Sequence, residues 1–133
     1  MTFVDTSAIY AVLDRDDHEH NLAKQIWGLL LNSEETLLTS NYVLVECCAL
    51  AQHRLGLDAV RVIEEDMRPV MKVQWVDEQV HRIAITALLA ARRRKLSLVD
   101  CSSFEVMRQR QVRRAFAFDK HFVEEGFLLP QFE

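Results

Sequence analysis

The feature that most constrains the fold is a regular alternation of short apolar runs with longer segments of helical spacing. The apolar runs have the length of β-strands and lie at residues 3–4, 36–39, 70–76, 115–118 and 127–130. Between them, apolar residues recur every three or four positions, most clearly from Val80 to Ala91. The runs are mostly apolar throughout, so we expect strands that are buried on both faces. The sequence therefore predicts an α/β fold with a central, mostly parallel sheet and helices on each side.

The length and composition fit a single domain over residues 1–133. With three glycines and two prolines, the chain has few turn-forming residues and no segment that resembles a flexible linker. The three cysteines are odd in number and lie in apolar sequence, which favours buried, reduced thiols. No apolar stretch is long enough to span a bilayer, and Met1–Val4 carries no basic leader region. We therefore expect a soluble, cytoplasmic protein without a membrane partner.

Four carboxylates lie where an apolar run ends or is interrupted: Asp5, Glu46, Asp100 and Asp119. An ionised carboxylate beside a hydrophobic core is costly unless it is paired, hydrogen-bonded or bound to a metal. Asp5 and Asp119 each follow a predicted strand, and in parallel sheets ligands bind at the carboxyl ends of the strands. If the fold brings the four side chains together, they form an acidic pocket that requires a divalent cation.

Each of these carboxylates also has a structural interpretation. Asp5 fits the N-cap of a helix, Asp100 has the position of the acidic residue in a capping box, and Asp119 is a common type of turn residue after a strand. Glu46 lies in the apolar segment 43–51, which offers it no charged partner one helical turn away. A helix this apolar is expected to be buried on most sides, so we expect Glu46 to face a pocket.

Basic residues are concentrated in one segment, although the formal net charge of the chain is −4. Between residues 92 and 114 there are eight basic side chains and two acidic ones. A basic segment around an acidic residue suits a phosphate backbone that is held near a metal ion. The run from Arg92 to Lys95 equally fits the end of a helix, where positive charge complements the helix dipole, and the later arginines fit a solvated helix face.

Four segments together resemble a known family: Phe3–Ser7, Tyr42–Glu46, Leu98–Phe104 and Phe116–Phe122. They are similar to the PIN-domain nucleases and, within these, to the VapC-like group, the toxins of type II toxin–antitoxin pairs. Each motif is short, but the four occur in the family's order and span essentially the whole chain.

The resemblance implies a three-layer α/β/α sandwich and Mg²⁺- or Mn²⁺-dependent hydrolysis of RNA phosphodiester bonds by an endoribonuclease. Asp5, Glu46, Asp100 and Asp119 match the family's acidic quartet, which holds the metal and carries the catalysis. One or two ions are compatible with such a quartet, and Glu46 is either a ligand or a base that acts through a water.

Further expectations concern individual residues and binding partners. Thr6 or Ser7 matches the hydroxyl position beside the first aspartate, which we assign to cofactor binding. His121 follows the last aspartate and fits either the pocket or the surface. Family members often form dimers, and the toxins are held inactive by an antitoxin, so we expect an RNA substrate, a homodimer and a cognate antitoxin. The candidates for RNA contact are Arg92, Arg93, Arg94 and Lys95.

Other functions remain compatible with parts of this pattern. A PIN protein that binds RNA or a partner without cutting has the same fold, although the intact quartet favours cleavage. A phospho-accepting receiver domain also has an acidic Mg²⁺ pocket, but it needs an acidic pair after the first strand and a Lys after the last one. Here Thr6 and Ser7 follow Asp5, and no Lys follows Leu129. A haloacid-dehalogenase-type phosphatase needs a second Asp where Ser7 stands.

Overall fold

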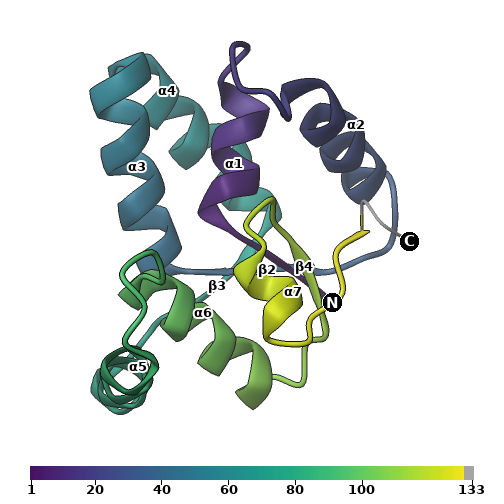
Figure 1. Cartoon of the computed structure of the whole chain (residues 1–133). Coiled ribbons are helices and arrows are strands. Elements are labelled where there is room, and N and C mark those ends of the chain that lie inside the picture. The colour runs from purple at the N-terminus through teal and green to yellow at the C-terminus, as the bar shows by residue number, and fades with distance from the viewer. Residues whose placement is uncertain (131–133) are drawn as a thin grey trace.

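The structure is a computed structural model that describes residues 1–130 (Figure 1), so the last three residues of the expected single domain lie outside the described part. In chain order the elements are β1 (Thr2–Val4), α1 (Thr6–Leu13), α2 (His20–Leu31), β2 (Leu37–Ser40), α3 (Asn41–Leu55), α4 (Leu57–Val62), β3 (Lys72–Gln74), α5 (Glu78–Ala91), α6 (Leu98–Gln109), β4 (Arg114–Phe116) and α7 (His121–Glu124). A π-helical turn (Ile63–Met67) and a 3₁₀ turn (Arg68–Val70) connect α4 to β3.

The strands form a four-stranded parallel sheet with the order β3-β2-β1-β4. β1 lies inside the sheet, with Phe3 opposite Leu38 on one side and opposite Ala115 on the other. Figure 1 shows α1 and α2 on one side of the sheet and α5 and α6 on the other. The predicted α/β/α sandwich is therefore confirmed.

The strand order changes direction beside β1. The chain runs outwards from β1 through β2 to β3, and it then returns to place β4 on the other side of β1. In open α/β sheets, ligands bind at such a switch point, outside the carboxyl ends of the strands. Asp5 follows β1 directly and Asp119 lies three residues beyond β4, so the topology brings both to this edge of the sheet.

Side-chain caps explain where the longer helices begin and end. The Ser40 side chain accepts the Val43 N–H at the start of α3, and Asp77 accepts the Val80 N–H at the start of α5. Gly56 ends α3 with a φ of 100°, a backbone conformation that L side chains rarely adopt. The sequence indicates the same boundaries, with Ser40 or Asn41 as the cap of α3, Gly56 as its end and Asp77 as the cap of α5.

The core fills both faces of the central strands. Phe3, Leu38 and Phe116 come from three neighbouring strands and are fully buried, as are Ile9 of α1 and Phe122 of α7. Because such interiors are close-packed, the strand ends that carry the acidic residues are held on a rigid platform.

β3 is shorter than predicted. It covers Lys72–Gln74 instead of residues 70–76, because Pro69 lies in the 3₁₀ turn that precedes it. It is also an edge strand with Lys72 exposed, so the expectation that all strands are buried on both faces is wrong for β3.

β4 is also shorter than predicted. It ends at Phe116, and the N–H of Phe118 donates to Ser7 Oγ at 2.9 Å instead of to a neighbouring strand. Ser7 lies in the first turn of α1, directly after β1. Its hydroxyl therefore links the ends of β1 and β4, which carry Asp5 and Asp119.

The strand predicted at 127–130 does not form. A single parallel bridge joins Leu128 to Arg114, and Pro130 has no N–H with which to extend the pairing. The sequence also predicts a helix from Leu57 to Met67; this helix is present, and its last turn is π-helical.

The α3 helix is buried along one stripe. Val43, Cys47 and Ala51 are fully buried, whereas Val45 is 70% exposed. The expectation that this helix is buried on most sides is therefore wrong, and an apolar face of α3 lies on the surface.

Two further observations concern the residues that the structure describes. No helix within residues 1–130 is both long enough and apolar enough to cross a membrane. The three cysteines are free thiols; Cys47 and Cys101 are buried, and Cys48 is half-buried.

Candidate active site

Asp5 lies directly after β1 and begins α1. Its Oδ2 accepts hydrogen bonds from the Ser7 backbone N–H at 3.1 Å and from Ser7 Oγ at 2.7 Å. The residue is 3% exposed, and no cationic side chain within residues 1–130 forms an ion pair with it. The N-cap interpretation is confirmed, but the cap leaves a buried carboxylate without a positive partner.

Asp100 lies in the first turn of α6 and is 6% exposed. Its Oδ2 accepts the Ser97 N–H at 3.1 Å, and Ser97 Oγ accepts the Asp100 N–H at 3.0 Å. The capping box that the sequence predicted is therefore present. The positive end of the α6 dipole also favours a negative charge at this position.

Asp119 follows β4 and is less deeply buried, with 29% of its side chain exposed. Its Oδ1 accepts the His121 N–H at 2.9 Å, which fixes the turn into α7. The His121 ring is buried, and its Nε2 lies 3.8 Å from the same oxygen. Asp119 therefore shapes the turn and also faces the imidazole ring.

The three aspartates use their oxygens in the same way. In each case one carboxylate oxygen accepts a backbone N–H hydrogen bond, through Oδ2 in Asp5 and Asp100 and through Oδ1 in Asp119. Within the described part of the chain, no hydrogen bond occupies the second oxygen of any of them. The backbone bonds set the direction of each side chain, and the other oxygen remains available to a ligand.

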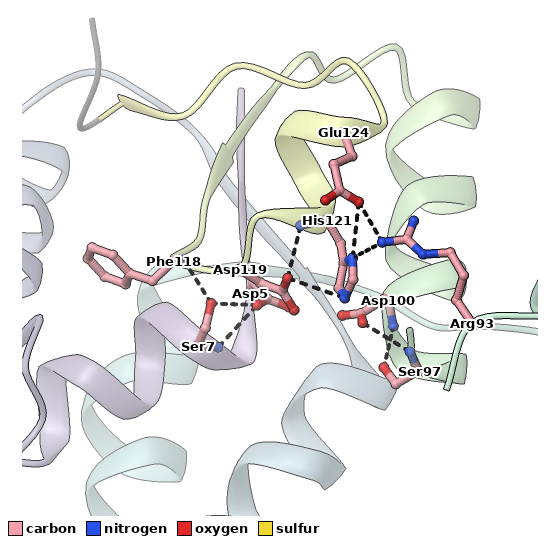
Figure 2. A network of polar contacts seen from close by, with 9 residues as sticks. All are labelled: Asp5, Ser7, Arg93, Ser97, Asp100, Phe118, Asp119, His121 and Glu124. Atoms are coloured by element: carbon pink, nitrogen blue, oxygen red, sulfur yellow. Dashed lines mark hydrogen bonds and ion pairs between the residues drawn. The ribbon is translucent and has the colours of Figure 1, made fainter. Parts of the chain in front are cut away.

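The fold brings these side chains together. Figure 2 shows Asp5, Asp100, Asp119 and His121 pointing toward one another from different elements. One ligand atom each from Asp100, Asp119 and His121 lie within 4.8 Å of one another. Residues that are distant in the sequence therefore form one polar centre at the switch point.

Glu46 lies at the edge of this centre. It is half-buried on α3 and lines a groove of about 450 Å³, together with Tyr42, His81 and Leu98. Within residues 1–130 no hydrogen bond or ion pair occupies its carboxylate, and its charge raises the pKa of both Asp5 and Asp100. Glu46 thus faces a groove, as we expected, and it belongs electrostatically to the acidic cluster.

Burial makes the ionised forms of two aspartates unfavourable. Loss of solvent is the main reason that the pKa of Asp5 is raised to about 7, with the charges of Asp100 and Glu46 adding to it and the Ser7 hydrogen bonds opposing it. Burial likewise raises the pKa of Asp100, the charges of Asp119 and Glu46 add to this, and the capping box opposes it. The centre therefore carries an excess of negative charge that the protein alone does not neutralise.

The structure distinguishes the two hydroxyl candidates next to Asp5. Ser7 Oγ donates to Asp5 and accepts the N–H of Phe118, so it joins the ends of β1 and β4. Thr6 Oγ1 instead points to α3 and donates to the Val43 carbonyl at 3.5 Å. Ser7 is therefore the hydroxyl that belongs to the candidate site, and Thr6 packs beneath it.

The basic run after α5 has more than one structural role. Arg92 ends α5 in a left-handed conformation, with a φ of 54°. Arg93 pairs with Glu124 at 2.6 Å and also reaches His121. Arg94 and Lys95 are exposed, and no ion pair occupies them within the described residues. The RNA-binding prediction thus applies best to the last two residues, because Arg93 is bound to another element of the protein.

His121 is a site residue that sequence reasoning did not assign to the pocket. Figure 2 shows its ring between Asp119 and the Arg93–Glu124 pair. The sequence signal was its position two residues after the acidic residue at the end of β4. That spacing alone does not distinguish a buried ring from an exposed one.

The donor set is rich in carboxylate oxygens. Such oxygens are the preferred ligands of Mg²⁺ and also bind Mn²⁺. A cation here would offset the repulsion within the cluster and would bring the pKa values of the buried aspartates back down. On chemical grounds, the arrangement fits a divalent metal ion that binds a phosphate group.

Comparison with known proteins gives a consistent picture. The PIN domain family model matches residues 2–128. The chain is 34% identical over 129 residues to the 23S rRNA-specific endonuclease VapC20 of Mycobacterium tuberculosis, a match that covers 96% of each protein and is found in two strains. The crystal structure of VapC20 from Mycobacterium tuberculosis, described as a sarcin–ricin loop cleaving toxin, superposes with a TM-score of 0.87 and 32% identity, over 96% of this chain and 97% of that one. The chain therefore belongs to the PIN-domain family, as a relative of its VapC toxins.

Proposed function

We propose that this protein is a metal-dependent endoribonuclease that hydrolyses RNA phosphodiester bonds and acts as the toxin of a toxin–antitoxin pair. The observation that carries the proposal is the cluster of buried carboxylates at the switch point of a PIN-family sheet. The proposal is supported by the VapC20 relative, whose name describes a 23S rRNA-specific endonuclease and whose structure has the same fold.

The proposed cofactor is Mg²⁺ or Mn²⁺. The fit rests on the donor set, because Asp5 and Asp100 are buried without a cationic partner among residues 1–130 and each has a second oxygen outside its capping bonds. A bound divalent ion supplies positive charge that stabilises the charge growing on the phosphate and makes a water more acidic. The protein's contribution is to hold the ligand atoms in place through the capping hydrogen bonds.

The residues of the chain have different roles in this proposal. Asp5, Asp100 and Asp119 hold the cation. Ser7 fixes the direction of the Asp5 carboxylate through its 2.7 Å hydrogen bond. Glu46 lies at the edge of the groove, where it accepts a proton from the attacking water or completes the ligand set.

The phosphate backbone is proposed to approach from the side of the basic run. Arg94 and Lys95 precede the capping box of Asp100 by a few residues and extend into solvent. Their charges would attract RNA to a centre that is itself negative, and phosphate contacts of this kind position a nucleic acid without reading its sequence.

An apolar groove supports the expectation of a protein partner. It has a volume of about 500 Å³ and is lined by the outer face of α3, the π-helical turn and Trp75. Trp75 is 64% exposed and Val45 is 70% exposed, and exposed apolar surface of this kind marks interaction sites. We assign this surface to a second copy of the chain or to a cognate antitoxin, and we place the protein in the cytoplasm with its RNA substrate.

The test is cleavage of RNA by purified protein that is free of antitoxin. The substrates are a mixed RNA pool and an RNA that contains the sarcin–ricin loop, each with Mg²⁺, with Mn²⁺ and with EDTA. Asp5→Asn is the inactive variant, and Asp58→Asn, on the exposed start of α4, is the matched control. We expect cleavage that requires the metal, is retained by Asp58→Asn, and falls by roughly 100-fold or more in Asp5→Asn.

A binding-only PIN protein is the second candidate function, because the same acidic and basic surfaces would also hold RNA. It predicts that metal-loaded protein shifts the mobility of these RNAs without shortening them. That result with both substrates and both ions would contradict the nuclease proposal.

A further inference from the structure

We propose that His121 is a nitrogen ligand of the metal ion in this site and that Glu124 holds its ring in the ligating orientation. This inference deepens the proposed nuclease function and rests on it. It adds an imidazole nitrogen to the carboxylates of the expected donor set, and therefore changes the metal that the site should prefer.

The first support is the distance between the donor atoms. One ligand atom each from Asp100, Asp119 and His121 lie within 4.8 Å of one another. Nε2 of His121 is 3.8 Å from Asp119 Oδ1, which is too long for a hydrogen bond. The ring nitrogen and the Asp119 carboxylate are therefore close enough for one ion to contact both, because ligands about 2.1 Å from a metal are roughly 3–4 Å apart.

The second support is the way in which the ring is held. The Asp119 side chain accepts the backbone N–H of His121 at 2.9 Å. The next residue, Phe122, is fully buried and packs edge-on against Phe104, with ring centroids 5.0 Å apart. His121 itself is 5% exposed, so its ring has little freedom to turn away from the carboxylates.

The third support is the carboxylate behind the ring. Glu124 Oε2 lies 3.4 Å from His121 Nδ1, and Arg93 pairs with that same oxygen at 2.6 Å (Figure 2). A metal-binding histidine usually donates its other N–H to a carboxylate, and this contact fixes both the tautomer and the direction of the ring. Arg93 holds Glu124 in place from an element that is distant in sequence.

The position of the ring proton decides between two arrangements. If the proton is on Nε2, it points toward Asp119, and Nδ1 accepts from Arg93 Nη2, which lies 3.1 Å away. If the proton is on Nδ1, it is donated to Glu124, and the lone pair of Nε2 faces the two aspartates. Only the second tautomer offers a free lone pair on Nε2, so binding of a cation at Nε2 selects it.

The consequence is a preference among divalent ions. Mg²⁺ favours oxygen ligands, whereas Mn²⁺ and the later transition metals also bind imidazole nitrogen well. The site should therefore bind Mn²⁺ more tightly than Mg²⁺, and removal of the imidazole should reduce the affinity for Mn²⁺ more than the affinity for Mg²⁺.

The test is pulsed electron paramagnetic resonance of the full-length protein loaded with Mn²⁺. We expect a nitrogen coupling to the ion that changes when the histidines are labelled with ¹⁵N. The coupling should be lost in His121→Asn and retained in His53→Asn, which changes an exposed histidine on α3. The labelled wild-type protein shows whether a histidine binds the ion even if a variant folds poorly.

Calorimetric titrations of the same proteins with Mn²⁺ and Mg²⁺ supply the second readout. Glu124→Gln should weaken Mn²⁺ binding by about 10–100-fold, which is the usual effect of losing the partner of a ligating histidine. His121→Asn should reduce the preference for Mn²⁺ over Mg²⁺, while His53→Asn should leave both affinities unchanged.

Metal-loaded wild-type protein without a histidine nitrogen coupling would overturn the inference, even if it cleaves RNA. Retention of the nitrogen coupling in His121→Asn would overturn it as well. Conversely, a clear coupling in protein that cleaves no RNA would leave this ligand assignment in place and contradict the nuclease proposal instead.

Discussion

At the scale of single residues, Asp5 is the group whose charge is most unfavourable in the metal-free protein. Its pKa is about 7 in the folded protein, mainly because of burial, against an ordinary value of 3.8. Between these two pH values the folded protein keeps a proton that the unfolded chain has lost. The contribution of this proton to the free energy of unfolding is fully present below about pH 4 and is lost as the pH rises through about 7. The loss amounts to at most roughly 4 kcal/mol.

Asp5→Asn should remove most of this dependence, because an uncharged amide has no proton to lose and its oxygen can still accept the Ser7 bonds. We expect the metal-free variant to be more stable than the wild type at pH 8 and similar to it near pH 4. Urea unfolding in EDTA at several pH values measures the difference. Mg²⁺ or Mn²⁺ at pH 8 should raise the melting temperature of the wild type and have little effect on the variant. Parallel stability curves for the two metal-free proteins would contradict this account.

Ser7 offers a second test at the same scale. Ser7→Ala removes the hydroxyl that orients Asp5, and it also leaves the Phe118 N–H without its acceptor. We expect a loss of about 1–3 kcal/mol in the free energy of unfolding, together with weaker metal binding at pH 7. Thr6→Val is the matched control, because the Thr6 hydroxyl makes a longer bond of 3.5 Å that points away from Asp5. Equal effects of the two substitutions on metal affinity would show that Ser7 has no special role.

At the scale of elements, the sheet separates the basic residues into two groups. Arg94 lies in the loop before α6, close in sequence to the Asp100 capping box, whereas Arg113 precedes β4 at the opposite, amino-terminal edge of the sheet. Both side chains are exposed. The long-range charge of the two residues is the same, so only their place relative to the site differs.

Arg94→Gln should weaken RNA binding and reduce the slope of log affinity against log salt concentration by about 1, while Arg113→Gln should change neither. Fluorescence anisotropy with a labelled RNA and Asp5→Asn as the background measures binding without cleavage. If both substitutions weaken binding equally, the basic surface acts only through net charge.

The elements also show how far the sequence determines the structure. Helical periodicity and the caps at Ser40, Asp77 and Ser97 are local signals, and they predicted the helix boundaries well. The strand ends were less predictable, because β4 stops where a backbone N–H turns to Ser7, a residue 111 positions away. Such a contact leaves no mark in the local apolar pattern.

At the scale of the whole molecule, parallel topology is the reason that the acidic residues could be predicted as one set. Each of them lies just after a strand or early in a helix, and a parallel sheet gathers such positions at one edge. The role that we propose for His121 could not be predicted in this way, because it depends on Arg93, which follows α5, and on Glu124 of α7. At Asp5 and Asp100 the capping bonds use one oxygen, so capping does not exclude the metal binding that we propose for the other oxygen.

The exposed face of α3 makes a prediction about assembly. Ala49 lines the apolar groove beside Trp75 and is exposed, so Ala49→Glu should break self-association through this face. Leu29→Glu changes another exposed apolar residue, on α2, with 72% of its surface exposed, and serves as the control. In sedimentation velocity we expect a dimeric wild type, a monomeric Ala49→Glu and a dimeric Leu29→Glu. A monomeric wild type, or loss of the dimer in both variants, would contradict assembly through this groove.

The central claim is that the acidic cluster holds a cation without which RNA is not cut. The most direct measurement is a titration of Mn²⁺ into metal-free protein, in which the rise in melting temperature and the cleavage rate of an RNA containing the sarcin–ricin loop are followed in the same buffer. We expect both quantities to increase with the same midpoint and neither to change in Asp5→Asn. Cleavage that persists in EDTA, or a fully loaded and stabilised wild-type protein that leaves both this RNA and a mixed RNA pool intact, would contradict it.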